Sequence, residues 1–192
     1  MARPKEFDYS KKLNMARELF WEKGYAGTSM NDLVDRLQLN RSSIYSSFGN
    51  KHQLFLACLQ SYIAMKEKEY VTTASKGKSP LGSVIAIVND VEHYIIKDTK
   101  TCLSTYTTFE LGRLDVDVYK VLQKQSEKTV GLFETLLEKA QEIGEVPKDK
   151  SPKDLAYYIV SSFAAIWYAD ILFKDSTVTK KVKEIIVSGI KE

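Results

Sequence analysis

Apolar residues recur every three or four positions along almost the whole chain, and this spacing limits the fold more than any other feature. The spacing places apolar side chains on one face of an α-helix. Only 9 Gly and 4 Pro interrupt 192 residues, and the prolines stand where helices would begin or be joined. We therefore predict an all-α chain of about nine helices, with no strand and no internal repeat.

The ends of several helices can be predicted from capping residues. A first helix should end at Gly24, and a second should open at Ser29, where Asp32 completes a pattern like a capping box. Asn40 should cap a short third helix that ends at Phe48. Further start signals are Asp115 and Ser151-Pro152.

The helix that begins after Ser151 is apolar almost all round as far as Phe173, so we expect it to be buried on several sides. Its apolar stretch, 159–173, is too short to span a bilayer. The N-terminus lacks a signal-peptide pattern, and Cys58 and Cys102 provide no disulfide framework. These features predict a cytoplasmic protein without a membrane partner.

The excess positive charge lies in the first quarter of the chain. Residues 1–52 contain nine Lys/Arg and six Asp/Glu, whereas residues 53–192 are balanced. A local basic excess is expected of a nucleic-acid-binding module, although a solvated surface also produces one. We predict a DNA-binding domain at 1–52 and a second domain at 53–192.

The third helix has the pattern of a recognition helix in a helix-turn-helix unit, which we place at about 29–48. Ile44 and Phe48, four residues apart, should face the core. An arginine near a helix start can bind the O6 and N7 atoms of guanine, and serine hydroxyls can bind bases or phosphates. The residues expected to face outward are Arg41, Ser42, Ser43, Tyr45 and Ser46. A solvated helix face with a cap is the alternative.

Residues 13–59 resemble the N-terminal domain of the TetR family of transcriptional regulators. The matching residues are Ala16, Leu19, Phe20, Gly24, Tyr25, Gly27, Thr28, Ser29, Met30, Asp32, Leu33, Val34, Ile44, Tyr45, Phe48, Lys51, Leu54 and Phe55. The resemblance implies a homodimer that binds a palindromic operator in double-stranded DNA, usually as a repressor. It also implies a C-terminal domain that binds a small-molecule effector, and no cofactor.

The resemblance implies individual contacts with DNA. Phosphates would be bound by Thr28 or Ser29 and by Ser43, Tyr45 and Lys51; bases would be read by Arg41, Ser42 and Ser46. A basic arm of Arg3, Lys5, Lys11 and Lys12 would add a contact, or would be a tail without a role. The family usually has Gly where this chain has Gln38, so a left-handed turn there would cost about 1 kcal/mol.

The second domain contains 14 of the 21 aromatic residues, and such rings form core more often than ligand sites. The resemblance favours a cavity, with these candidate ligand-binding residues: Tyr62, Cys102, Tyr106, Phe109, Phe133, Phe163 and Trp167. Cys102 suggests an alternative function as a thiol sensor of electrophiles or redox state. The last two helices should form the dimer face, through the small residues Ser161, Ser162, Ala164, Ala165 and Ala169 and the apolar Val182, Ile186 and Ile190.

The sequence predicts no catalytic residues, because no Ser/His/Asp arrangement or Gly-rich phosphate loop can be argued from it. His52 and His93 have no metal-ligand spacing around them, so no metal is predicted. A helical protein-interaction module without DNA binding is a further alternative, supported by Gln38 and the modest charge.

Overall fold

The computed structural model describes residues 7–97 and 101–191. Over these residues it contains nine α-helices and no strand, which confirms the predicted all-α class. The helices are α1 (Tyr9–Lys23), α2 (Met30–Leu37), α3 (Arg41–Phe48), α4 (Lys51–Ala74), α5 (Pro80–Lys97), α6 (Leu103–Leu111), α7 (Val116–Glu142), α8 (Pro152–Phe173) and α9 (Ser176–Lys191).

The predicted capping residues fix the short helices at the N-terminus. Gly24 ends α1 with a φ of 73°, and its N–H donates to the carbonyl of Phe20. Ser29 and Asp32 form a complete capping box at the start of α2. The Asn40 side chain accepts the N–H of Ser43 at 2.8 Å and so begins α3. Each signal lies within three residues of the group it satisfies, which is why these boundaries can be predicted.

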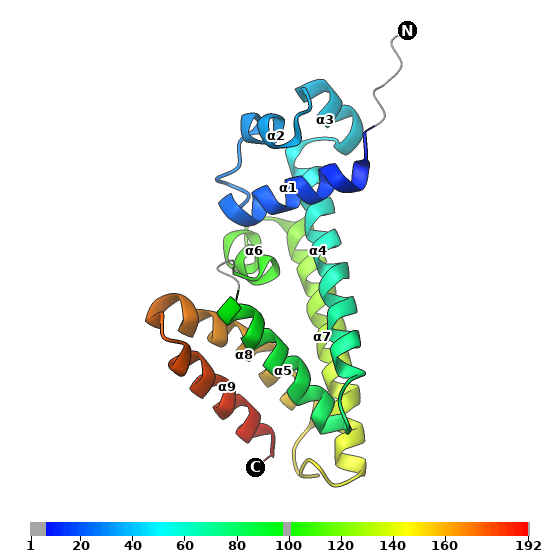
Figure 1. The fold of residues 1–192 in the computed structure, drawn as a ribbon. Helices are drawn as coiled ribbons and strands as arrows, with labels where there is room; N and C mark the ends of the chain where they lie inside the picture. Colours follow the sequence, from blue (N-terminus) through cyan, green and yellow to red (C-terminus); the bar gives the residue numbers. More distant parts are fainter. Residues whose placement is uncertain (1–6, 98–100, 192) are drawn as a thin grey trace. The chain divides into compact units, whose positions relative to one another are not determined.

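The chain forms two compact units, and the first contains residues up to Ala64 together with Leu103–Val121. Figure 1 shows α1, α2 and α3 packed around the start of α4. Their buried side chains include Phe20, Leu33, Ile44 and Phe55. α6 and the first turn of α7 belong to the same unit. The predicted functional boundary between residues 52 and 53 stays a prediction.

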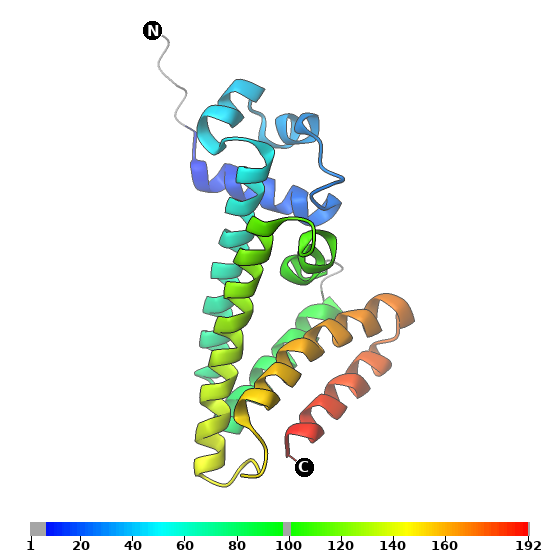
Figure 2. The same cartoon turned by 180° about the vertical axis from the view of Figure 1, so that it is seen from behind.

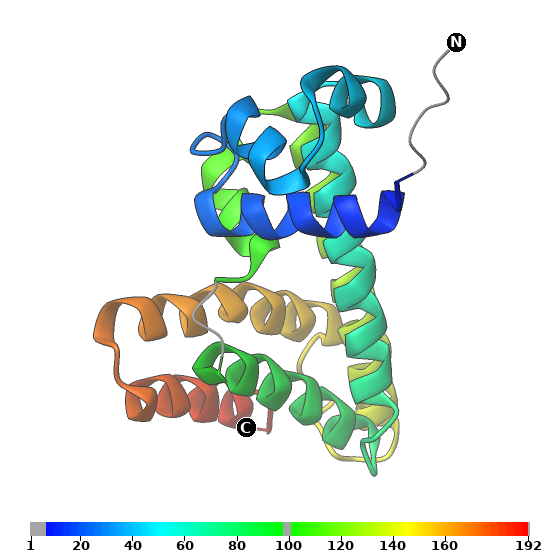
Figure 3. The same ribbon diagram turned by 45° about the horizontal axis from the view of Figure 1, so that its top comes forward.

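The second unit contains Met65–Cys102 and Leu122–Glu192. Within it, α8 packs against α9, and both contact α5, as Figure 3 shows. Its core contains Val88, Phe133, Ile159 and Ile186. The second half of α7 runs beside the second half of α4 (Figure 2), where Lys128 contacts the Glu67 carboxylate at 3.0 and 3.1 Å.

The expectation that α8 is buried on several sides is wrong for a single chain. One face, which includes Ile159 and Ile166, is buried against neighbouring helices, whereas Tyr168 and Leu172 are 61% and 57% exposed. The whole helix has 22 residues and is long and apolar enough to cross a membrane by composition alone, so the shortness of 159–173 does not exclude a span. One such helix is weak evidence for a membrane span, because core helices of soluble proteins pass the same test.

Candidate nucleic-acid interface and effector region

Ion pairs hold α2 against α1. Lys23 donates to Asp32 at 2.5 Å, and Arg36 donates to Glu22 at 2.5 Å. The pKa of Asp32 lies below its ordinary value, first because Lys23 donates to its carboxylate and then because Ser29 does. These surface contacts hold α2 against α1. α2 directly precedes α3, the predicted recognition helix.

The turn between α2 and α3 keeps a left-handed residue although glycine is absent. Gln38 has φ 51° and ψ 43°, and its side-chain amide donates to the carbonyl of Asp35 at 2.6 Å. This confirms that the turn requires the conformation that glycine adopts most easily. The side-chain hydrogen bond offsets part of the cost of placing a Cβ there. The departure at Gln38 therefore no longer supports the alternative of a module that does not bind DNA.

The two sides of α3 differ as predicted. Ile44 is fully buried and Phe48 is 7% exposed, where its ring stacks on Tyr9 with centroids 4.7 Å apart. The opposite side exposes Arg41, Ser42, Tyr45 and Ser46, while Ser43 is half-buried. The helix therefore presents polar and cationic groups on one continuous face and anchors itself through the other.

The Arg41 side chain is held in one orientation by α2. Its Nη2 atom donates to Oδ1 of Asn31 at 2.7 Å. A guanidinium carries five N–H donors in a planar fork, so the remaining donors stay available for an acceptor pair such as O6 and N7 of guanine. Asn31 was not among the predicted residues, because its role follows from packing and not from a motif.

The predicted phosphate ligands occupy different environments. Thr28 is fully buried and its hydroxyl donates to the carbonyl of Gly24 at 2.6 Å, so this side chain does not reach the surface. Ser29 is exposed, but its hydroxyl donates to Asp32 at 2.5 Å. Of the two predicted alternatives, the exposure of the side chain favours Ser29. Ser46 donates to the carbonyl of Ser43 at 3.1 Å.

Lys51 lies at the first position of α4, with its ammonium 4.3 Å from the centroid of the Tyr25 ring. Such a contact between a cation and an aromatic face is attractive. Partial burial lowers the pKa of Lys51, whereas the nearby charges of Glu110 and Asp32 raise it. The ammonium is therefore held on an aromatic surface just beyond the end of α3.

The predicted basic arm is divided between different elements. Arg3 and Lys5 lie outside the described residues. Lys11 is exposed in the first turn of α1. Lys12 donates to the carbonyl of Leu37 at 2.6 Å and so satisfies the C-terminal end of α2. Lys12 is thus part of the helix packing and not of an arm.

Two contacts that the sequence did not predict join distant elements of the first unit. One connects α6 with the turn after α1, and the other connects α4 with the start of α7. The Glu110 carboxylate accepts backbone N–H groups from Tyr25 and Ala26. Nε2 of His52 lies 2.7 Å from Oδ2 of Asp115. No local pattern signals either contact, because each joins residues more than sixty positions apart.

His52 also lies near two carboxylates, contrary to the expectation from spacing. Its ligand atom and those of Asp115 and Asp117 lie within 4.8 Å of one another. Asp115 is already engaged as the cap of α7, because its Oδ1 atom accepts the N–H groups of Asp117 and Val118 at 3.0 Å. Helix capping and the contact with His52 account for this arrangement.

The candidate effector residues are divided between the two compact units. Tyr62, Tyr106 and Phe109 lie in the first unit, where Tyr62 is fully buried against Trp21 and Phe109 is 79% exposed. Cys102, Phe133, Phe163 and Trp167 lie in the second unit. The structure therefore brings some of the seven residues together, but not all of them within one unit.

An aromatic cluster forms in the second unit around Phe163. The Phe163 ring lies 5.9 Å from that of Phe133 and 6.3 Å from that of Tyr70. Trp167, one turn further along α8, meets the Tyr94 ring at 6.4 Å. The ammonium of the buried Lys66 lies 3.8 Å from the Tyr94 centroid and donates to Glu69 at 2.8 Å. Lys66, Tyr70 and Tyr94 were not predicted.

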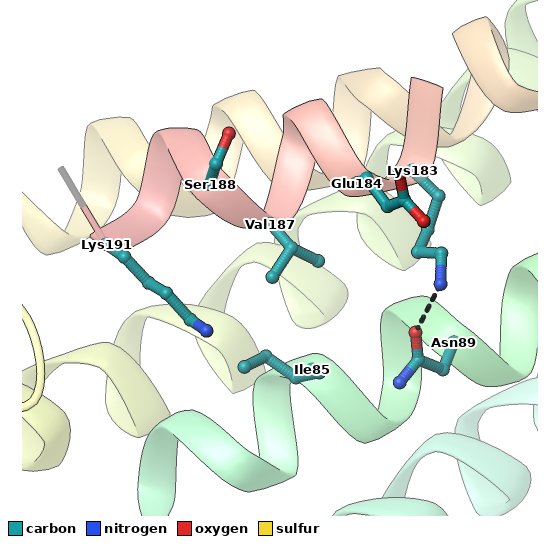
Figure 4. Close-up of a pocket in the computed structure, with 7 residues that line it drawn as sticks. All are labelled: Ile85, Asn89, Lys183, Glu184, Val187, Ser188 and Lys191. Carbon is teal, nitrogen blue, oxygen red and sulfur yellow. Dashed lines mark hydrogen bonds between the residues drawn. The ribbon is translucent and has the colours of Figure 1, made fainter. Parts of the chain in front are cut away.

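A separate hollow of about 330 Å³ lies between α5 and α9, and its lining residues are drawn in Figure 4. Ile85 and Asn89 come from α5, and Lys183 of α9 donates to Asn89 at 3.2 Å. The remaining lining residues are Glu184, Val187, Ser188 and Lys191. This hollow contains none of the predicted ligand-binding residues.

The predicted dimer face is only partly at the surface. Ile186 and Ile190 are 4% and 0% exposed, so they belong to the core of the second unit and cannot meet a partner. On α8, Ala165 is exposed, whereas Ala169 is buried. The stripe of α9 was assigned to the wrong neighbour, because periodicity identifies a buried face but not the chain that covers it.

The two cysteines differ in environment. Cys58 is fully buried, and burial raises the pKa of its thiol to about 12. Cys102 is half-buried and directly precedes α6. No disulfide joins Cys58 to Cys102.

The comparisons with known proteins agree with this arrangement. The family model for "Bacterial regulatory proteins, tetR family" matches residues 13–58. The transcriptional regulator YezE of Bacillus subtilis (strain 168) is 31% identical over 169 residues, covering 84% of this chain and 85% of YezE. The transcriptional repressor ComR of Escherichia coli (strain K12) is 28% identical over 162 residues, covering 82% of this chain and 76% of ComR.

The fold is also similar to that of a solved protein–DNA complex. A cysteine mutant of the TetR-family regulator CifR, complexed with 26-base-pair operator DNA, aligns with a TM-score of 0.82 and 20% identity, covering 97% of this chain and 98% of that one. The similarity to YezE covers 84% of this chain, so it extends well beyond the N-terminal helices matched by the family model. The chain therefore belongs to the TetR family and is a DNA-binding transcriptional regulator.

Proposed function

We propose that this regulator binds a two-fold symmetric operator as a homodimer, acts as a repressor in the cytoplasm, and releases DNA when a small molecule binds its C-terminal helices. The observation that carries the proposal is the division of α3 into a buried side and an exposed polar side. A recognition helix requires this division, because one side must pack while the other enters the major groove.

The exposed residues have the chemistry of groove recognition. We assign base reading to Arg41, Ser42 and Ser46. We assign phosphate binding to four further residues: Ser29, Ser43, Tyr45 and Lys51. Asn31 supports the assignment of Arg41, because it fixes one end of the guanidinium in the unbound protein. A side chain that is already oriented loses less conformational entropy when it binds.

The dimer face is proposed on the exposed side of α8. Tyr157, Tyr168 and Leu172 are 52%, 61% and 57% exposed, and Ser161 and Ala165 lie between them at helical spacing. Ile185 of α9 is 65% exposed and lies one turn before Gly189, where a Cβ would be 3.3 Å from the Tyr158 hydroxyl. Exposed apolar side chains thus lie on both of these packed helices, and such exposed apolar groups favour an interface with another chain.

A charge on this surface tests the dimer. Leu172→Glu should yield monomers at protein concentrations where the wild type is dimeric, because the carboxylate would be desolvated in the interface. Val71→Glu is the matched control, since Val71 is 59% exposed on α4. Size-exclusion chromatography with light scattering measures both. A dimeric Leu172→Glu variant, or equal dissociation of the two variants, would show that the face lies elsewhere.

Selection of duplexes from a random DNA pool tests operator binding. The purified dimer should enrich a two-fold symmetric sequence whose half-sites lie about 34–36 Å, or a multiple of that distance, apart. Binding should weaken steeply as salt rises, because phosphate contacts release counterions. A folded dimer that enriches no sequence would refute the proposal.

The effector site is proposed in the C-terminal helices. The aromatic pairs Phe133–Phe163 and Tyr94–Trp167 favour an apolar or planar molecule, which such rings can stack against. The effector would act by binding more tightly to a dimer whose recognition helices are wrongly spaced for the groove. Titration of bound operator with candidate planar molecules, followed by fluorescence anisotropy, tests this.

A thiol-sensing regulator is the second candidate function. Cys102 directly precedes α6 and is only half-buried, whereas Cys58 is fully buried, so Cys102 is the thiol that an electrophile can reach. Alkylation of Cys102 should then lower operator affinity, and a Cys102→Ser variant should be insensitive. Unchanged operator binding by the alkylated wild type would eliminate this candidate.

A further inference from the structure

The Glu110 carboxylate clamps the turn that follows α1. Its Oε2 atom accepts the backbone N–H of Tyr25 at 3.1 Å, and its Oε1 atom accepts that of Ala26 at 2.9 Å. Hydrogen bonds to an ionised acceptor are stronger than those between neutral groups. Glu110 belongs to α6, so a helix 85 positions along the chain fixes the backbone of this turn.

The fit between α6 and the turn is close. Gly24 has a φ of 73°, and a Cβ there would lie 2.7 Å from the Tyr106 hydroxyl and 3.0 Å from the Glu110 carboxylate. The buried Thr28 hydroxyl closes the same turn by donating to the Gly24 carbonyl at 2.6 Å. The turn therefore has little freedom to move while Glu110 remains in place.

The clamped turn carries the aromatic surface on which Lys51 rests. The Tyr25 ring is packed against Phe55 with centroids 4.9 Å apart and meets the edge of His52 at 6.3 Å. The Lys51 ammonium lies 4.3 Å from the Tyr25 centroid. Fixing the Tyr25 backbone thus fixes the position of the ring beneath the ammonium.

The start of α4 is also held by α7. His52 follows Lys51 directly, and its Nε2 atom lies 2.7 Å from Oδ2 of Asp115. Asp115 in turn caps α7 through the N–H groups of Asp117 and Val118. The residue next to Lys51 is thus anchored to a separate helix, so the first turn of α4 is restrained on two sides.

We propose that Glu110 and Tyr25 are positioning residues for the phosphate contact of Lys51. This inference rests on the proposed DNA contact of Lys51. A free lysine side chain has many rotamers and loses much entropy when a phosphate fixes it. The Tyr25 ring restricts the side chain before DNA arrives, and Glu110 keeps the ring in place.

The direction in which DNA affinity changes when the Glu110 charge is removed distinguishes a positioning role from simple repulsion. Burial lowers the pKa of Lys51, and Glu110 lies close enough for its negative charge to oppose this shift, so the charge acts near the DNA-binding groups. By electrostatics alone, Glu110→Gln should strengthen DNA binding, because DNA is an anion. If Glu110 positions Lys51, the same substitution weakens binding, because glutamine replaces one of the two accepting oxygens with an NH2 group, which cannot accept an N–H.

The test measures operator affinity by fluorescence anisotropy at several salt concentrations, with the duplex selected by the wild type. Glu110→Gln should weaken binding about tenfold for each protomer, and so up to about a hundredfold for the dimer, as expected for one lost charge-assisted contact in each copy. The slope of log affinity against log salt should fall in magnitude by about 0.9 for each protomer. Asp35→Asn is the matched control: it changes the charge equally at an exposed position of α2 and should bind as well as or better than the wild type.

A lysine variant separates positioning from general destabilisation. In a Lys51→Met background, Glu110→Gln should cause no further loss of affinity. Tyr25→Leu should behave like Glu110→Gln, and Tyr25→Phe, which keeps the ring, should bind more tightly than Tyr25→Leu. Circular dichroism checks that each variant is folded, and the Tyr25 pair replaces Glu110→Gln if that variant does not fold.

The possible failures are distinguishable. If the wild type selects no duplex, the proposed function fails. If Lys51→Met weakens binding but Glu110→Gln binds as tightly as the wild type, the inference fails while the function stands. Additive losses in the double variant would likewise overturn it, because Glu110 would then act independently of Lys51.

Discussion

The backbone at Gln38 can be tested by comparing an alanine with a glycine at that position. Gln38 is left-handed, with φ 51° and ψ 43°, and it sets the turn that leads into α3. A left-handed conformation costs a residue with a Cβ about 1–2 kcal/mol. Glycine avoids this cost but loses about 0.5–1 kcal/mol through its greater freedom in the unfolded chain.

The difference between these two effects determines which of the two variants is more stable. Gln38→Gly should be more stable than Gln38→Ala by about 1 kcal/mol, which corresponds to roughly 2–4 °C in Tm for a chain of this size. Gln38→Ala should be less stable than the wild type by about 0.5 kcal/mol, because it loses an exposed hydrogen bond. That bond is the one from the Gln38 amide to the Asp35 carbonyl, at 2.6 Å.

The assay is urea denaturation at one fixed protein concentration, because the proposed dimerisation would make the apparent stability depend on concentration. The same pair of substitutions at Asp35, an exposed position inside α2, is the control. There alanine should be more stable than glycine, since the backbone is helical. If alanine is also the more stable residue at position 38, the turn is not left-handed and our account of how α3 is placed is incorrect.

Three further predictions concern recognition, reactivity and acid stability. Arg41→Ala should relax the preference at one base pair by about 1–3 kcal/mol, whereas Tyr45→Phe should weaken binding to all duplexes similarly. Affinities for operators with single base-pair substitutions distinguish the two effects. An unchanged preference in Arg41→Ala would exclude base reading by Arg41. In the native protein an alkylating reagent should modify Cys102 before Cys58, whose pKa burial raises to about 12, and mass spectrometry that found equal rates would contradict this. Contacts with Lys23 and Ser29 lower the pKa of Asp32, so its contribution to stability is present above its ordinary pKa and is lost as pH falls through the lower folded value. Asp32→Asn should therefore reduce the pH dependence of the Tm below about pH 4. An unaltered pH dependence would count against these contacts.

Local chemistry explains which features the sequence predicted. Ser29 caps α2 with Asp32, and Asn40 caps α3, through contacts that span three residues. The burial of Ile44 and Phe48 follows from their spacing on one helix. These features depend on the residues of one element, so a single chain is sufficient to predict them.

Contacts between distant elements were not predictable in this way. Glu110 holds the backbone of Tyr25 across 85 positions, and nothing in its neighbourhood differs from an ordinary helix surface. Six of the seven candidate effector residues are aromatic side chains at helical spacing, a property that Tyr62 in the first unit shares with Phe163 in the second. Spacing identifies the inward face of a helix, but it does not determine which helices meet there.

The helix α8 shows how the same limitation leads to a proposal about assembly. Its sequence is apolar almost all round, which favours burial on several sides, yet the described chain covers only the face that contains Ile159 and Ile166. On α9 the residues expected to face a partner, Ile186 and Ile190, are instead buried within the chain. The remaining apolar surface, formed by Tyr168, Leu172 and their neighbours, therefore needs an occupant from outside. A two-fold symmetric operator also requires a second recognition helix. In the proposed dimer, a second copy of this chain related by a two-fold axis would supply both, since an isologous interface pairs the same surface with itself.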